Sequence, residues 1–318
     1  MRTIPAVAAA IGAVAFFTPP VLAQSSLTQT TATPQSKVLT QKLNAAVECL
    51  NRLSERSYSS RSRYFSWAAK SGPTGKERII YGTYTIYDTS RCQQGVEKTN
   101  ALEPREPELE TASSAYVTAV VALEPLLKEA DDYYSQQDYK DDKMAKGRAL
   151  HPRLVAAWDA FAKADEKLRK IVDEEQDKQA RARLAEIERT EGIKDRYHVE
   201  AVMLSAKYVM RAQQASPPDL AAFIKAIEEY EAIVKATEDY AAENKGSKVG
   251  SSYVRDAKTF LTTAKMLMRR VRDKVPYSQG DRMLMQSGGG GWMVEGSPAR
   301  LSKDYNQLVG SYNRGGRF

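Results

Sequence analysis

The sequence is poor in the side chains that hydrolases commonly use near neutral pH, because it holds only two histidines and two cysteines in 318 residues. Nucleophilic catalysis needs a base beside a serine or cysteine, and the Gly-x-Ser-x-Gly motif of many hydrolases is missing. We expect His151 at a helix start, in a surface or capping role, and His198 as a half-buried helix residue. The sequence therefore predicts no catalytic residue and no cofactor.

The cysteines and histidines are also too scattered for a metal site. Cys49, Cys92, His151 and His198 lack the short paired spacings of zinc ligands, so no metal is expected. In an oxidising compartment an even cysteine count indicates a disulfide, and Cys49–Cys92 is the one pairing that two cysteines allow. Closing a loop of roughly 40 residues would stabilise the fold by about 4 kcal/mol on the chain-entropy account.

A large excess of one charge is absent as well. Lysine and arginine number 47, aspartate and glutamate 40, and the formal net charge is +7. Since the two signs are interleaved along the chain, no basic face is expected to hold a phosphate backbone, and nucleic acid is excluded as a partner. Four basic residues near the C-terminus could make weak peripheral contact with anionic lipid or cell-wall polymer, although a solubilising tail explains them more simply: Arg300, Lys303, Arg314 and Arg317.

Long apolar runs occur only at the N-terminus. Arg2, an apolar stretch over residues 4–17 and Val21-Leu22-Ala23 form the pattern of a secretory signal peptide over residues 1–23. Gln24 follows the expected cleavage site, so the cysteine that carries a lipid anchor is missing. No later segment is apolar enough to be a transmembrane segment. The sequence thus predicts a periplasmic or secreted protein.

Helical periodicity is what the sequence has in abundance. After a polar leader over residues 24–36, expected to be disordered, apolar side chains recur at alternating steps of four and three. Such stripes predict long helices within residues 39–67, 109–134 and 150–191, ending at Gly192, and three more between residues 197 and 275. Stripes of this length need partner helices to cover them. The expected fold is all-α, an elongated antiparallel helical bundle over residues 37–285.

The rest of the chain is expected to differ from this bundle. Residues 286–318 are predicted to be a Gly-rich connector and a short C-terminal helix, with Ser297 as its cap and Pro298 as its first residue. "IIYGTYTIY", residues 79–87, is β-branched and aromatic, and it predicts a short extended or hairpin segment near residues 77–88. The preceding "SGPTGKER" is excluded as a phosphate-binding loop, because Lys70 and Glu77 stand where glycine and Ser or Thr are required.

One stretch, "YYSQQDYKDD", combines tyrosines with acids between two predicted helices. As a corner it is largely explained, since Asp141 or Asp142 can cap the next helix and Asp142 can pair with Lys146 four residues on. The corner does not account for the tyrosines, whose amphipathic rings could line a binding cleft. The candidate cleft residues are Tyr133, Tyr134, Tyr139, Asp141 and Asp142.

Three stretches carry a resemblance to a known family: "GPTGKERIIYG" at residues 72–82, "YYSQQDYKDDKMAKGRALH" at residues 133–151, and "YNQLVGSYN" at residues 305–313. On these the chain resembles the YiiG-like family of exported bacterial proteins, a domain of unknown function, over nearly the whole mature chain. The resemblance implies an extracytoplasmic helical domain and supplies no reaction, so no catalytic residue follows from it. Some relatives are lipoproteins, and this sequence departs from them in lacking the lipid-bearing cysteine.

Together these features favour a non-catalytic exported helical-bundle protein that binds a cell-envelope protein or polymer. The alternative is an envelope hydrolase in which carboxylates such as Asp141 and Asp142 cleave a glycan or peptide, because glycoside cleavage uses two acids roughly 5 to 10 Å apart. Neighbouring side chains on a helix diverge by about 100°, which disfavours adjacent acids as such a pair.

Overall fold

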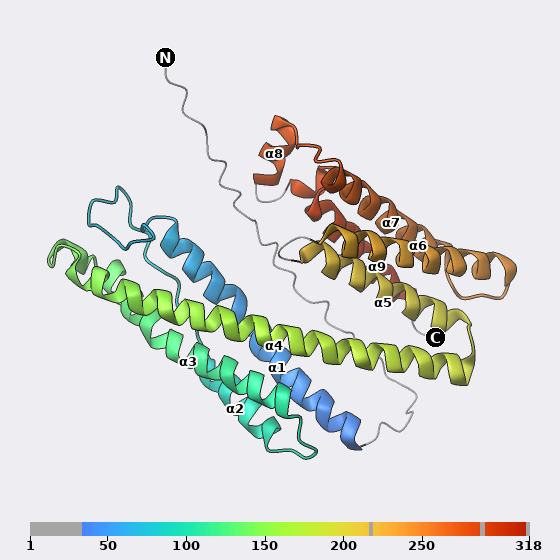
Figure 1. Cartoon of the computed structure of the whole chain (residues 1–318), viewed down its shortest axis with the longest axis horizontal. Coiled ribbons are helices and arrows are strands. Elements are labelled where there is room, and N and C mark those ends of the chain that lie inside the picture. The colour runs from blue at the N-terminus through green and yellow to red at the C-terminus, as the bar shows by residue number, and fades with distance from the viewer. Residues whose placement is uncertain (1–33, 216–218, 287–289, 316–318) are drawn as a thin grey trace. The chain divides into compact units, whose positions relative to one another are not determined.

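The computed structural model describes residues 34–215, 219–286 and 290–315. Over these ranges the protein is all-α and has no strand, as the sequence predicts (Figure 1). The helices are α1 Pro34–Phe65, α2 Thr89–Asn100, α3 Pro107–Ser135, α4 Ala145–Glu191, α5 Asp195–Gln214, α6 Leu220–Glu243, α7 Ser251–Arg272, α8 Gln279–Gln286 and α9 Pro298–Gly315, with two short 3-10 turns, η1 Asp138–Lys140 and η2 Gly291–Met293. The predicted signal peptide, almost all of the leader and part of the connector lie outside the described residues.

The described chain divides into two compact units, and α4 contributes to both. The first unit runs to residue 178 and contains α1, α2, α3 and most of α4. The second unit begins at residue 179 and contains the end of α4 and all later helices. The domain boundaries expected from the sequence, 37–285 and 286–318, stay a prediction.

The core of the first unit is built from the stripes that the periodicity indicated. On α1, Leu43, Ala46, Leu50 and Leu53 are buried at steps of three and four, which keeps them on one face. They pack in one hydrophobic cluster with buried residues of α3 and α4, among them Leu123, Leu127, Leu154, Trp158, Phe161 and Leu168. The predicted disulfide between Cys49 and Cys92 is present and joins α1 to α2 across 43 residues.

A buried ion pair fixes the start of α3 against α1. Lys42 and Glu110 pair with side chains that are only 1% and 5% exposed. The Lys42 ammonium also donates to the carbonyl oxygens of Leu102 at 2.8 Å and Pro104 at 3.0 Å. Arg105 donates from Nε to the other Glu110 oxygen at 2.8 Å. The hydrogen bond from Arg105 is the largest cause of a pKa for Glu110 lowered to about 2.

A second buried carboxylate, Asp165 of α4, connects three helices. It accepts hydrogen bonds from Ser54 Oγ at 2.5 Å, Tyr58 OH at 3.1 Å and Arg169 Nε at 2.8 Å. The Tyr116 hydroxyl of α3 lies 2.9 Å from Ser54 Oγ. Burial raises the pKa of Tyr58 and of Tyr116, so both phenols stay neutral. Because buried charge needs hydrogen-bond partners, this network gives α1, α3 and α4 a fixed register.

The second unit packs α5, α6, α7 and α9 around a separate core that includes Val202, Val209, Phe223, Ile227, Tyr230, Phe260, Leu301 and Leu308. Its last helix is capped as predicted, because Ser297 Oγ accepts from the Arg300 amide at 3.1 Å and Pro298 opens the helix. Buried Asp304 accepts from Thr263 Oγ1 at 2.6 Å and binds α9 to α7. The residues expected to form a basic tail thus begin on a packed helix, and Arg317 lies outside the described residues.

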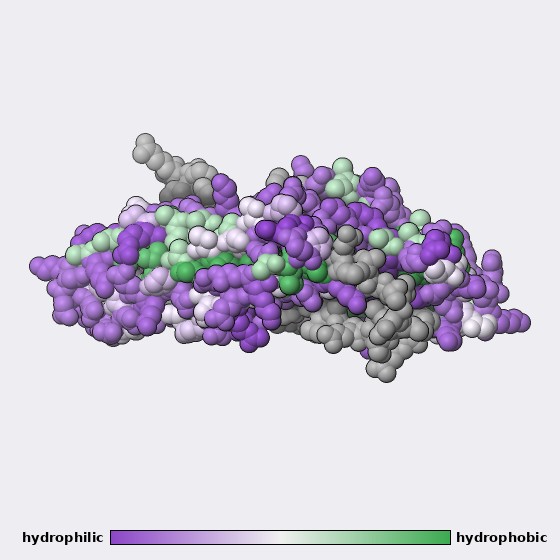
Figure 2. All heavy atoms as spheres, turned by 90° about the horizontal axis from the view of Figure 1, so that it is seen from below, coloured by the Kyte–Doolittle hydropathy of each residue, from purple (hydrophilic) through white to green (hydrophobic). Residues whose placement is uncertain are grey.

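Among the described helices, none is long and apolar enough to cross a membrane. Figure 2 shows a face on which hydrophilic side chains dominate and apolar side chains gather in narrow patches.

Candidate functional site

The segment between α1 and α2 is held along α1 by side chains of that helix. The chain turns after α1 and passes back toward α2 (Figure 1). Residues 79–87, here named the tyrosine segment, form neither helix nor strand. Its carbonyl oxygens accept four hydrogen bonds from side chains. Three donors lie on α1: Arg56 Nε donates to Thr85 O at 3.1 Å, Ser60 Oγ to Tyr84 O at 2.7 Å and Arg63 Nε to Tyr81 O at 2.8 Å. The fourth donor is Trp67, two residues after the end of α1, whose Nε1 donates to Gly82 O at 2.9 Å. Because Arg56, Ser60 and Arg63 follow one another at steps of four and three, these three donors lie on one side of α1.

Two arginines also hold the ring of Tyr84. The guanidinium carbons of Arg56 and Arg63 lie 4.1 Å and 4.5 Å from its centre. Arg63 lies 5.6 Å from the centre of the Tyr81 ring as well. A guanidinium over a tyrosine face is attracted by the ring quadrupole, by about 0.5–1 kcal/mol at an exposed site. The tyrosine segment is therefore fixed through both its backbone and its rings.

The outer side of this segment exposes large apolar side chains. Ile79, Tyr81 and Tyr87 are 51%, 49% and 65% exposed. We name these three residues, with Arg56 and Arg63, the tyrosine face. Single exposed apolar residues are ordinary, but aromatic rings gathered on a fixed segment mark a candidate interaction site.

Of the predicted cleft residues Tyr133 and Tyr134, Tyr134 lies against Gly82 of the tyrosine segment, and the Tyr133 ring packs beside it. They are only 1% and 5% exposed. The Tyr134 ring lies 5.0 Å from the Trp67 ring, centre to centre. Gly82 has a φ of +68°, and a Cβ on it would lie 3.2 Å from Tyr134 Cβ. The Tyr134 side chain therefore supports the tyrosine segment from inside, and Gly82 allows the close approach.

Tyr139, Asp141 and Asp142 occupy the adjoining corner. The half-buried Tyr139 ring lies 6.5 Å from the rings of both Tyr133 and Tyr134, and Asp141 is exposed. The structure thus brings the predicted residues to one corner of the first unit. A ligand cleft at this corner stays a prediction.

Asp142 caps α4, as the sequence predicts. Its carboxylate accepts from the amides of Ala145 at 3.2 Å and Lys146 at 2.8 Å, and from Tyr133 OH at 2.8 Å. The hydrogen bond from the Lys146 amide is the largest cause of the lowered pKa of Asp142. The expected ion pair between Asp142 and Lys146 is wrong, because the Lys146 ammonium lies 3.6 Å from Glu129 Oε1 instead.

The expectation of a surface or capping role for His151 is also wrong. Its side chain is buried, with Nδ1 2.9 Å from Tyr64 OH and Nε2 3.1 Å from the Lys70 carbonyl oxygen. The reason is that α4 already begins at Ala145, so His151 lies inside the helix and faces the core. His198 is likewise buried on α5 rather than half-buried, and its desolvation lowers its pKa.

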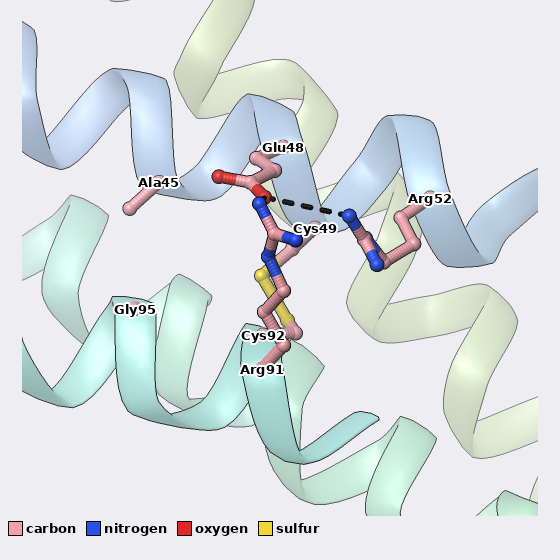
Figure 3. A pocket seen from close by; sticks show the side chains of 7 residues that line it. All are labelled: Ala45, Glu48, Cys49, Arg52, Arg91, Cys92 and Gly95. Carbon is pink, nitrogen blue, oxygen red and sulfur yellow. Dashed lines mark ion pairs between the residues drawn. A yellow bond between two sulfur atoms is a disulfide. The ribbon is translucent and has the colours of Figure 1, made fainter. Parts of the chain in front are cut away.

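A small hollow lies beside the disulfide (Figure 3). Its lining includes Glu48, whose carboxylate is 2.9 Å from Arg91 and 3.7 Å from Arg52. The hollow has a volume of about 20 Å³, which is room for about one water molecule. It is therefore too small for a ligand.

The structure does not support phosphate binding by the loop at residues 71–78. The Glu77 carboxylate accepts from the amides of Thr74 at 2.5 Å and Gly75 at 2.8 Å, so a side chain already occupies the amides that a phosphate would need. Within the ranges that the structure describes, no three His, Cys, Asp or Glu residues are grouped to hold a metal ion.

The tyrosine face itself was not predicted as a site. From the sequence, residues 79–87 are expected only to be an extended or hairpin segment in a helical protein. The available signal was that this β-type stretch has no second such run with which to pair, so its rings had to pack on a helix or face solvent.

Comparison with known proteins places the chain among relatives without an assigned activity. The family model described as "Protein of unknown function (DUF3829)" matches residues 37–314. The chain is also similar to the "Uncharacterized protein YiiG" of Escherichia coli strain K12, with 34% identity over an alignment of 301 residues that covers 92% of this chain and 85% of that protein. No solved structure matches the chain.

Proposed function

The chain belongs to this YiiG-like family of unknown function, and from that premise we propose that it is an exported protein that binds a protein of the cell envelope through its tyrosine face. The observation that carries the proposal is the exposure of Tyr81 and Tyr87 on a segment fixed by four hydrogen bonds from one side of α1 and its end. Tyrosine and arginine are enriched among the residues that dominate binding energy at protein interfaces.

The fixed backbone of the segment supports a binding role. Ordering a loop on binding costs free energy, because each backbone residue that becomes fixed loses about 1–2 kcal/mol of conformational entropy. Here the carbonyls of Tyr81, Gly82, Tyr84 and Thr85 are already held before any partner arrives. The segment is thus preorganised, which lowers the cost of association.

The ring environment favours a protein partner over a polysaccharide. Sugars bind aromatic side chains by lying against a ring face. Arg56 and Arg63 already lie over the Tyr84 ring, and Arg63 lies near Tyr81. The exposed rings of Tyr81 and Tyr87, with these guanidinium groups beside the segment, suit a mixed polar and apolar protein surface.

The geometry of the acids supports binding over the hydrolase alternative. Asp142 uses its carboxylate to cap α4, and its lowered pKa is opposite to what a general acid requires near neutral pH. Asp141 is exposed to solvent. Location in the envelope is supported by the disulfide, because such bonds persist in oxidising compartments.

The experiment is site-specific cross-linking in cells of the source organism. A photoreactive benzoylphenylalanine replaces Tyr87, and in a matched control it replaces Ile193, which is 53% exposed in the second unit. We expect a discrete cross-linked protein from position 87 alone. Cross-links of equal pattern from both positions, or none from position 87, would overturn the proposal. Release of the cross-link by glycan-degrading enzymes but not by protease would instead identify a polymer.

A further inference from the structure

The second unit carries an exposed apolar surface where α7 ends. We name it the methionine tip, made of residues 271–286 and 290–293. Figure 1 shows α8 beside one end of α7 in this unit. Within the tip Met283 is 65% exposed and Met293 48%, and further exposed apolar side chains are Val271, Val275, Met285 and Trp292. No residue of α8 is buried, although helices of soluble domains usually bury one face.

The segments that carry these side chains pack against one another. A Cβ on Gly291 would lie 3.6 Å from the Met285 Cα and 3.2 Å from the Ala299 Cβ, so α8, η2 and the start of α9 are packed together. Tyr277 OH donates to the Gly296 carbonyl at 2.9 Å, which ties the link between α7 and α8 to the segment before α9. The apolar patch is therefore part of the folded unit.

Cations surround the apolar side chains. The Lys303 ammonium lies 4.3 Å from the centre of the Trp292 ring. Arg269, Lys274, Arg282 and Lys303 form no ion pair with any residue of the described ranges.

The nearby acids are fewer than the cations and offset them only in part. Asp273 pairs with Arg272 at 2.8 Å, and Asp281 accepts from the Ser278 amide at 3.0 Å at the start of α8. Glu295 is a third acid, and it is exposed beside the tip. Positive charge is thus in excess around an apolar centre.

We propose that the methionine tip docks on the surface of an anionic membrane, with Met283, Met293 and Trp292 inserted among the lipids. Thioether side chains are flexible and adapt to irregular apolar surroundings, which suits a lipid interface of no fixed shape. Tryptophan and methionine flanked by lysine and arginine match an interfacial contact, in which apolar groups enter the boundary and cations meet anionic headgroups. This inference does not depend on the tyrosine face, which lies in the other unit.

The test uses the exported, processed protein with vesicles of phosphatidylcholine that do or do not contain about 30% phosphatidylglycerol, a lipid that supplies negative surface potential. Co-sedimentation measures binding. Fluorescence reports insertion, since Trp158 is buried and Trp67 is hydrogen-bonded to Gly82, which leaves Trp292 as the exposed indole. We expect binding to the anionic vesicles only, with a blue shift of emission. Salt raised from about 0.1 M to about 1 M shortens the Debye length from about 10 Å to about 3 Å and should release the protein.

The matched variants separate the tip from general hydrophobicity. Met283→Gln with Met293→Gln is expected to weaken vesicle binding at least about tenfold, because two inserted apolar side chains are lost. Val121→Gln with Ile193→Gln removes exposed apolar groups elsewhere and should leave binding unchanged. Circular dichroism checks that both variants remain helical.

Three results would overturn the proposal. They are equal binding to zwitterionic vesicles, loss of binding in the control pair, and absence of vesicle binding by the folded protein. Self-association that disappears in the methionine variant, without vesicle binding, would assign the tip to a second copy of the chain.

Discussion

Arg63 of α1 donates a hydrogen bond to the Tyr84 hydroxyl at 3.0 Å, and its guanidinium carbon lies 4.5 Å from the centre of the same ring. The same side chain donates to the Tyr81 carbonyl at 2.8 Å. One helix residue thus holds two tyrosines of a segment that has no strand partner. The order of the tyrosine segment depends on this contact more than on any propensity of its own sequence.

Replacing Arg63 with alanine should therefore loosen the tyrosine segment without unfolding the unit. We expect exchange of the Tyr84 amide, which donates to Ser60 Oγ at 3.1 Å, to accelerate at least about tenfold, because local opening becomes more favourable. The matched control is Arg61→Ala, on the same helix as Arg63. It removes an exposed ion pair with Asp159 of α4 and should leave that exchange unchanged. Equal exchange in both variants would mean that Arg63 does not order the segment.

Gly82→Ala should destabilise the first unit by about 1–2 kcal/mol, because a φ of +68° is unfavourable for alanine and its Cβ would crowd Tyr134. Gly95→Ala is the control, since it lies inside α2 with open space around its Cβ. That change should stabilise the protein by about 0.5–1 kcal/mol. Urea unfolding measures both, and a stabilising effect of Gly82→Ala would contradict the support that we assign to Tyr134.

The periodicity predicted the helices well because steps of four and three report burial directly. The α1 stripe of Leu43, Leu50 and Leu53 is one example, and the cap at Ser297 is another local signal that held. Helix α8 was missed for the same physical reason, since it buries no residue and leaves no stripe to detect.

Other features depend on contacts between distant parts of the chain, which local patterns do not report. Tyr134 is buried because Gly82 and Trp67 pack on it. These residues precede Tyr134 by 52 and 67 positions, which is farther than a local sequence window reaches. The tyrosine face could not be predicted for the same reason, because local sequence patterns do not show that no strand covers its rings. His151 was misplaced because its role depends on where α4 begins.

Removing the disulfide should lower stability without changing the fold. For a bond that closes 43 residues, the chain-entropy account gives about 4 kcal/mol, and typical losses are about 2–4 kcal/mol. We expect Cys49→Ala with Cys92→Ala to lower the free energy of unfolding by that amount while far-ultraviolet circular dichroism stays helical. An unchanged free energy of unfolding would show that the crosslink adds no stability.

The Glu110 network predicts a defined dependence of stability on pH. A pKa lowered to about 2 lies below the usual value of about 4.3 for an unfolded glutamate. The ionised carboxylate therefore contributes stability that is present above about pH 5 and is lost as the pH falls toward about 2. The free energy of unfolding should fall across this window.

Glu110→Gln should lower the free energy of unfolding by about 2–3 kcal/mol at neutral pH, because Lys42 stays buried without its carboxylate partner. The free energy of unfolding of this variant should also vary less with pH between about pH 5 and pH 2. Glu129→Gln is the control, since its pairs with Lys146 and Arg153 are partly exposed and worth about 0–1 kcal/mol. Equal pH profiles for wild type and Glu110→Gln would contradict this assignment.

Binding of an envelope protein by the tyrosine face is measured as the affinity of the chain for the protein captured at position 87. Calorimetric titration compares the wild-type chain, Tyr81→Ala with Tyr87→Ala, and the control pair Val121→Ala with Ile193→Ala. Loss of two aromatic anchors worth about 2 kcal/mol each predicts that the dissociation constant rises at least about a hundredfold for the tyrosine pair and stays unchanged for the control. A tyrosine variant that folds normally and binds within about twofold of wild type, a difference below 0.5 kcal/mol, would contradict the account.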